Sequence, residues 1–253
     1  MPAFARELAR PPLPRPLVEL DVIDRDTGHA LPEYRHRGQD WIAGTPGHRY
    51  AVRLTNNTGE RVLVVLSVDG VNAVSGQTAA PSQAGYVLDP WESAEIAGWR
   101  KSLNDIAQFV FTDLPDSYAA RTGRADNVGV VGIAVFRERR TVYAPPAPPS
   151  PPVAMGRQRE AAKAGAPASA DRAVAAEAMP QRIGTGHGQH EFSPVGQTEF
   201  IRASSAPQQL SQIRYDDTSA LVAMGILPRP YRQYAQDTPR AFPGGFVADP
   251  PRH

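Results

Sequence analysis

The sequence predicts a mainly β protein: an antiparallel β-sandwich of about seven or more strands, with a proline- and alanine-rich linker and a small C-terminal hairpin and helix. Three observations support this fold class. Short apolar runs with a period of two recur between residues 17 and 143, turn-forming residues separate them, and the 26 prolines cluster in three stretches. Short strands that follow one another without helical patterns favour a sandwich over a βαβ fold.

The first strands are predicted from alternation. Residues 18–22 place Val18, Leu20 and Val22 on one face, as a half-buried strand does. Residues 50–55 alternate in the same way and stop at a turn-forming cluster, and residues 61–68 then supply an almost continuous apolar run. We expect these last two segments to form a β-hairpin.

The chain is expected to reverse at Asp69-Gly70, because both residues tolerate positive φ and the pair is typical of a tight turn. Asp89-Pro90 separates two short strands further along, since the residue before proline disfavours helix. The strands predicted beyond the turn cover residues 85–88, 94–99, 107–111 and 128–136.

Five segments are predicted along the chain: a flexible arm over 1–16, the sandwich over 17–143, a linker over 144–182, a second ordered piece over 183–227 and a disordered tail over 228–253. Within the second piece, residues 198–202 and 210–215 are candidate strands. Asp216-Asp217-Thr218 is expected to cap a short helix that reaches Met224, with Gly225 at its end. We expect this hairpin and helix to dock on the sandwich.

Composition excludes several classes of function. The net charge is +1, with 27 basic and 26 acidic residues, so no global field attracts nucleic acid. Cysteine is absent, which excludes disulfides, zinc-thiolate sites and thiol catalysis. The first sixteen residues lack the apolar core of a signal peptide, and no stretch approaches the roughly 20 apolar residues of a membrane span. Cytoplasmic residence is therefore the default expectation.

One glycine-rich stretch invites a functional interpretation. Gly184 to Gly188 resembles a phosphate-binding loop but lacks the lysine and Ser/Thr of a P-loop, so a flexible hinge is the favoured interpretation. His187, His190 and Glu191 could supply metal ligands, although a third firm ligand is missing and surface histidines are favoured. We therefore expect neither a metal nor a cofactor.

Catalytic signatures are weak. Neither Gly-x-Ser-x-Gly nor His-Glu-x-x-His occurs. Asp89, Glu92 and Glu95 could include the acid and base of a sugar-cleaving site, but solvated turn carboxylates are the favoured interpretation.

Four aromatic residues are the candidate binding residues: Trp41, Tyr86, Trp91 and Trp99. Exposed aromatic side chains on a sandwich stack on sugar rings or anchor a protein partner, whereas buried ones belong to the core. Trp91 follows Pro90 and precedes polar residues, which makes it the best candidate for exposure.

The segments Val68-Asp69-Gly70, 85–88 and 98–102 resemble those of an uncharacterised family of bacterial proteins, and they are more distantly similar to fungal domains of unknown function. The resemblance covers mainly residues 38–138, and the region from Ile183 also resembles part of the bacterial family. It implies a common β-sandwich and no activity, ligand or catalytic residue.

The function expected from the sequence is that of a non-catalytic binding or assembly module with a protein partner or a second copy as its target. The missing catalytic signatures and the long proline-rich segments favour it. A carbohydrate-binding or carbohydrate-active domain is the alternative, favoured by the aromatic set and the three carboxylates.

Overall fold

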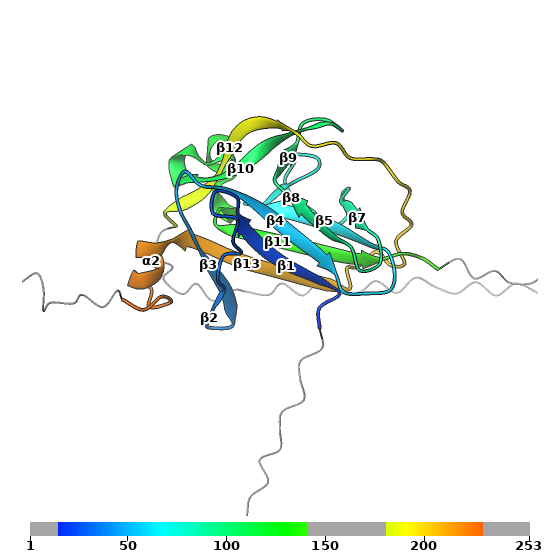
Figure 1. Ribbon diagram of the computed structural model, residues 1–253, viewed down its shortest axis with the longest axis horizontal. Coiled ribbons are helices and arrows are strands. Elements are labelled where there is room, and N and C mark those ends of the chain that lie inside the picture. Colours follow the sequence, from blue (N-terminus) through cyan, green and yellow to red (C-terminus); the bar gives the residue numbers. More distant parts are fainter. Residues whose placement is uncertain (1–14, 141–180, 230–253) are drawn as a thin grey trace, which may run out of the picture.

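The computed structural model describes residues 15–140 and 181–229. Two β-sheets pack face to face with the hydrophobic core between them, which confirms the predicted β-sandwich (Figure 1). The arm, the linker and the tail expected from the sequence lie almost entirely outside the described residues. Within the described part, no helix has the length and apolar character needed to cross a membrane.

The first sheet is antiparallel and has the strand order β1-β4-β10-β12, with β8 paired to β4 and β9 paired to β10. Its strands are β1 (Val18–Asp24), β4 (Arg49–Asn56), β8 (Ser93–Ile96), β9 (Gly98–Arg100), β10 (Asp105–Asp113) and β12 (Ile183–Phe192).

The second sheet has the order β2-β3-β13-β11-β5-β6, with β7 paired to β5. All its pairs are antiparallel except β13 with β3, which is parallel. Its strands are β2 (Tyr34–His36), β3 (Gln39–Gly44), β5 (Val62–Val68), β6 (Val71–Asn72), β7 (Tyr86–Leu88), β11 (Val130–Arg137) and β13 (Gln209–Asp217).

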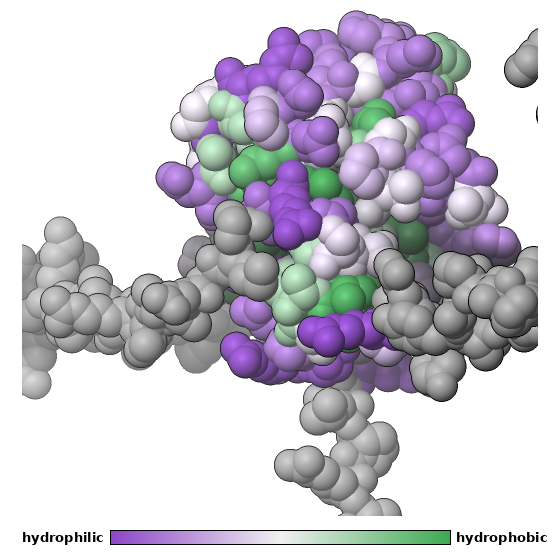
Figure 2. Space-filling view, turned by 90° about the vertical axis from the view of Figure 1, so that its left-hand side faces the viewer, coloured by the Kyte–Doolittle hydropathy of each residue, from purple (hydrophilic) through white to green (hydrophobic). Residues whose placement is uncertain are grey.

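Short helices lie at the ends of the strands. They are η1 (Leu114–Asp116), α1 (Tyr118–Arg121), η2 (Ala125–Asn127) and α2 (Thr218–Ala223), and α2 lies at the left end of the molecule in Figure 1. Seen from that end, the surface is mostly hydrophilic, and apolar residues gather in small patches near its centre (Figure 2).

Alternate residues of both sheets build the core, as the period of two predicts. The inward-facing side chains of β4, β5 and β11 are buried: Tyr50, Val52, Leu54, Val62, Val64, Leu66, Val68, Val131, Ile133 and Val135.

The Asp69-Gly70 turn is confirmed. Asp69 has φ 53° and Gly70 has φ 73°, and the flanking strands β5 and β6 pair as a hairpin. Such positive φ values at both central positions match the right-handed twist of the strands.

The hairpin expected from residues 50–55 and 61–68 is wrong. β4 belongs to the first sheet and β5 to the second, so the turn between them carries the chain from one sheet to the other. The Asn56 side-chain amide fixes this crossing, because it donates hydrogen bonds to the main-chain oxygens of Glu60 and Asp89.

The C-terminal piece is also built differently from the expected docked hairpin. β12 is a strand of the first sheet, paired with β10, and β13 lies inside the second sheet between β3 and β11. Residues 198–202 form no strand, apart from an isolated bridge between Glu138 and Arg202. The helix is confirmed as α2, with the Asp217 carboxylate accepting from the Ala220 N–H and Gly225 at φ 72°.

The glycine stretch 184–188 is part of strand β12, which overturns the hinge interpretation. A Cβ atom at Gly184 would lie 2.6 Å from Ser117 Cβ, and one at Gly188 would lie 2.7 Å from Val110 Cγ2. Glycine therefore lets this strand pack closely on its neighbours.

Candidate functional site

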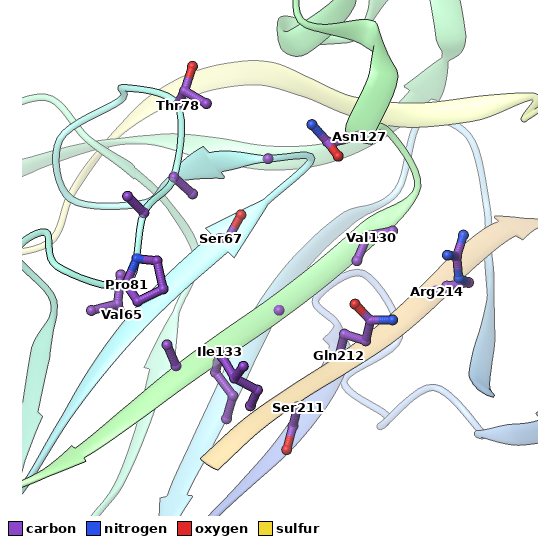
Figure 3. A pocket seen from close by; sticks show the side chains of 16 residues that line it. Val65, Ser67, Thr78, Pro81, Asn127, Val130, Ile133, Ser211, Gln212 and Arg214 are labelled. Carbon is purple, nitrogen blue, oxygen red and sulfur yellow. The ribbon is translucent and has the colours of Figure 1, made fainter. Parts of the chain in front are cut away.

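The candidate site is a groove of about 660 Å³ on the outer face of the second sheet, which we call the outer groove (Figure 3). Strands β5, β11 and β13 form its floor, and the loop after β6 forms one wall. Its lining residues are Val65, Ser67, Gly70, Thr78, Ala79, Ala80, Pro81, Asn127, Val130, Gly132, Ile133, Ala134, Leu210, Ser211, Gln212 and Arg214.

The groove exists because the outer face of this sheet is apolar and only partly covered. Leu63, Val65, Ala134 and Phe136 form a second, smaller hydrophobic cluster, and Phe200, from the connection between β12 and β13, packs against it. Beside this covered half, the floor stays open where Gly132 has no side chain. Leu210 borders the open part and is 71% exposed.

The wall of the groove is held by hydrogen bonds within the protein. The Ala79 N–H donates to the Gly70 carbonyl oxygen, and the Ala80 N–H donates to Gln83 Oε1. The Gln83 side-chain amide in turn donates to the Thr78 carbonyl oxygen. Because the loop is anchored in this way, the groove is formed before any ligand arrives.

Polar groups gather toward one end of the groove. In Figure 3, Asn127, Gln212 and Arg214 lie on one side, and Val65 and Pro81 lie on the other. The Arg214 guanidinium lies 5.7 Å from the centre of the Trp41 ring. Its Nε atom is buried without a hydrogen-bond partner in the part of the chain that is described. An arginine that lies over an aromatic ring and has no salt bridge to a carboxylate among residues 15–140 and 181–229 is suited to bind an anionic group.

The chemistry of the groove favours binding over catalysis. Its lining holds hydroxyl, amide and guanidinium groups but no carboxyl, imidazole, amine or phenol group. Such a set can donate and accept hydrogen bonds but has no group that titrates near neutral pH and could act as general acid or base.

The four aromatic candidates do not come together. Trp91 is 67% exposed, as expected, and it has φ 62°, which is rare for a bulky residue. Trp99 is buried against Phe109 and is a core residue, so the interpretation as a binding residue fails for it. Trp41 and Tyr86 are half-buried, with an arginine over each ring. Trp41 lies under Arg214, a lining residue of the outer groove.

The possible metal ligands on β12 are engaged elsewhere. Both oxygens of Glu191 accept hydrogen bonds from Arg25, at 2.7 and 2.9 Å, and this pairing lowers the pKa of Glu191. His187 stacks near Trp99, and burial lowers its pKa. The arrangement is a salt bridge beside an aromatic cluster.

The three carboxylates considered as an acid–base set also have separate structural partners. Glu92 accepts from the Asp89 N–H at 2.7 Å, and Glu95 pairs with Arg53 at 2.7 Å. Asp89 lies 3.5 Å from Arg61. They stabilise turns and strand pairs and do not converge on one substrate position.

A further cluster of Asp24, Asp26 and His48 has ligand atoms within 4.8 Å of one another. Asp24 Oδ1 accepts from two main-chain N–H groups, and its Oδ2 lies 2.7 Å from His48 Nδ1. Asp26 pairs with Arg49. Burial would raise the pKa of Asp24, but these hydrogen bonds lower it. The two carboxylates of the cluster therefore already have partners within the protein.

Sequence reasoning missed a buried polar network that ties the two sheets together. Asp69 is fully buried and accepts hydrogen bonds from the Gly129 N–H, the Thr185 N–H and the Tyr215 hydroxyl. Thr185 Oγ1 also lies 2.7 Å from the Tyr215 hydroxyl and 2.6 Å from that of Tyr50. Burial raises the pKa of Asp69.

No family model matches the sequence, and neither a curated protein nor a solved structure matches it. The resemblance to a bacterial family therefore stays a prediction, and the function is argued from the site alone.

Proposed function

We propose that the chain is a non-catalytic β-sandwich binding module that takes a segment of a protein partner in the outer groove. The observation that carries this proposal is the groove itself: a preformed hollow of about 660 Å³ with an apolar floor and, at its polar end, an arginine that forms no salt bridge with a described residue. Specific ligand sites in proteins combine apolar surface with a few polar groups in this way.

A polypeptide segment suits the shape and the chemistry of the lining. The floor crosses three strands and is open to solvent at Leu210, so a chain can lie across it without entering a closed cavity. The apolar side chains of the bound segment would cover Val65, Val130 and Ala134. The main-chain groups of the segment would form hydrogen bonds with the side-chain amides of Asn127 and Gln212. Arg214 would pair with a carboxylate of the segment.

A carbohydrate ligand is the second candidate, supported by the exposure of Trp91, which lies between β7 and β8. The outer groove itself has no aromatic ring among its lining residues, and sugar rings stack on such rings. A glycan array with the wild type and Trp91→Ala tests this alternative directly.

The proposal is tested by filling the groove. A Cβ atom at Gly132 would meet only Ser211 O at 3.6 Å and Gln212 Cβ at 3.8 Å, so a side chain at this position has room and projects over the floor. We would select peptides from a displayed library of random dodecapeptides against the wild type and measure their affinities for Gly132→Leu. The matched control is Thr55→Leu, which adds the same side chain to the outer face of the other sheet.

Gly132→Leu is expected to weaken the selected peptides by at least tenfold, and Thr55→Leu is expected to leave their affinities unchanged. Both variants should melt within a few degrees of the wild type. Equal affinity for wild type and Gly132→Leu, or a library without any enriched peptide, would contradict the proposed function.

A further inference from the structure

A second hollow of about 320 Å³, which we call the acidic hollow, lies beside β13 and is lined by carboxylates. Glu19 and Asp21 come from β1, Glu33 precedes β2, and Asp40 belongs to β3. Its remaining lining residues are Pro16, Val18, Leu20, Ser211, Gln212 and Ile213.

Three of these four carboxylates form no salt bridge within the described part of the chain. Asp40 pairs with Arg35 at 2.6 Å, whereas Glu19, Asp21 and Glu33 form no salt bridge with any described residue. Burial and then the charge of Glu19 raise the pKa of Asp21, with Arg53 opposing them. Loss of hydration and then the charges of Asp40, Asp21 and Glu19 raise the pKa of Glu33. A positive charge in this hollow would relieve the repulsion.

The outer groove and the acidic hollow meet at β13. Ser211 and Gln212 line both of them. Strand β3 pairs with β13 only from Ile213 onward, so no strand of the described structure pairs with residues 209–212 on that side. A chain that leaves the groove at Gln212 can therefore reach the hollow without displacing a strand.

Resting on the proposed function, we propose that the partner segment crosses β13 and places a lysine or arginine side chain in the acidic hollow while its apolar residues occupy the outer groove. The occupant is thus an extended protein segment with apolar residues next to a basic one. Charge complementarity supports it: the hollow supplies carboxylates, and a long basic side chain carries both an apolar stem and a cation.

The geometry favours such a side chain over a metal ion. Among the described residues, only Asp24, Asp26 and His48 bring three ligand atoms within 4.8 Å of one another, so the carboxylates of the hollow do not converge on one point. Spread carboxylates suit a cationic group with several hydrogen-bond donors, as in guanidinium or ammonium.

The test uses the full chain and the peptides selected above. In each peptide every lysine or arginine is replaced in turn by uncharged norleucine or citrulline, and affinities are measured for the wild type and for Asp21→Asn/Glu33→Gln. The control variant, Asp113→Asn/Asp116→Asn, removes the same number of charges from the last residues of β10 and η1, neither of which lines either hollow.

One basic residue is expected to be critical: its replacement should weaken binding to the wild type by at least fivefold and binding to Asp21→Asn/Glu33→Gln by less than twofold. The control variant should behave like the wild type. Peptides that need no basic residue, or that lose equal affinity with both proteins, would overturn the inference. If Gly132→Leu still weakens the binding of those peptides, the outer groove binds a protein segment but the acidic hollow does not bind its basic side chain. If Gly132→Leu has no effect on them, both the proposed function and this inference fail.

Discussion

Asp69 is predicted to be the polar residue on which the stability of the sandwich depends most. The informative substitution is Asp69→Gly, because φ is 53° at this position and glycine removes the side chain without adding strain. Three buried donors then lose their acceptor: the Gly129 N–H, the Thr185 N–H and the Tyr215 hydroxyl.

The magnitude follows from the number of donors. Each buried donor left without a partner costs about 1 to 3 kcal/mol. The Tyr215 hydroxyl keeps Thr185 Oγ1 within 2.7 Å, so it loses less than the two main-chain groups. The expected loss is therefore about 3 to 5 kcal/mol, which is a large part of the roughly 5 to 15 kcal/mol that stabilises a typical domain.

Urea unfolding followed by tryptophan fluorescence and by circular dichroism measures this loss. Asp69→Asn is the milder substitution for comparison, because it keeps the side-chain shape and the turn. Its NH₂ group would face one of the three donors that Asp69 accepts from, so we expect a smaller loss in the free energy of unfolding, of about 1 to 3 kcal/mol. A loss below about 1 kcal/mol for Asp69→Gly would refute the reasoning, because it would mean that water satisfies the three donors.

Three other outcomes are expected. Trp91→Gly should be more stable than Trp91→Ala by about 1 kcal/mol in urea unfolding, because only glycine adopts φ 62° without strain; equal stabilities would show that the backbone relaxes. The pKa of Asp21 is raised on folding, so the folded state binds the Asp21 proton more tightly than the unfolded state does. The resulting contribution to the free energy of unfolding is full below the unfolded-state pKa of 3.8 and is lost as pH rises through the folded-state pKa. Asp21→Asn should accordingly be stabilising relative to the wild type at pH 7 but not at pH 3, and a pH-independent difference would contradict this. Residues 15–143 expressed alone should fail to melt cooperatively and should recover cooperative melting when residues 181–229 are co-expressed, because β12 and β13 belong to different sheets; a cooperative transition of 15–143 alone would disprove it.

Local signals predicted much of the fold. Alternation identified β1, β4, β10 and β11, the Asp-Gly pair identified the β5–β6 turn, and the capping residues identified α2. Each of these features depends on residues close together in the chain, which is the information that a sequence pattern holds.

The errors share one physical cause, which is that sheet membership depends on distant partners. Nothing local distinguishes a hairpin from a crossing between two sheets, so β4 and β5 were wrongly paired. Glycine is a poor strand residue on its own, yet in β12 it is required by the close approach of Ser117 and Val110.

The candidate site was beyond sequence reasoning for the same reason. Val65, Gly132 and Arg214 become neighbours only when β5, β11 and β13 lie side by side, although about 150 residues separate the first from the last. In the sequence, aromatic residues were taken as the sign of a binding site. The groove instead contains a glycine within the strongly apolar strand β11 and an arginine on strand β13, where apolar and polar residues alternate. Those two signals were present at Gly132 and Arg214, but each is common in strands that bind nothing.

Strand β13 connects the site to the buried polar network around Asp69. Its inward-facing residue Tyr215 is anchored to Asp69 in the buried network, while its outward-facing neighbours Gln212 and Arg214 line the groove. Because successive residues of a strand point to opposite faces, one short segment holds both the residue that anchors the strand and the residues that line the groove. A site built on such a strand loses little conformational entropy when a ligand binds. The contacts between ligand and protein therefore contribute more fully to the free energy of binding.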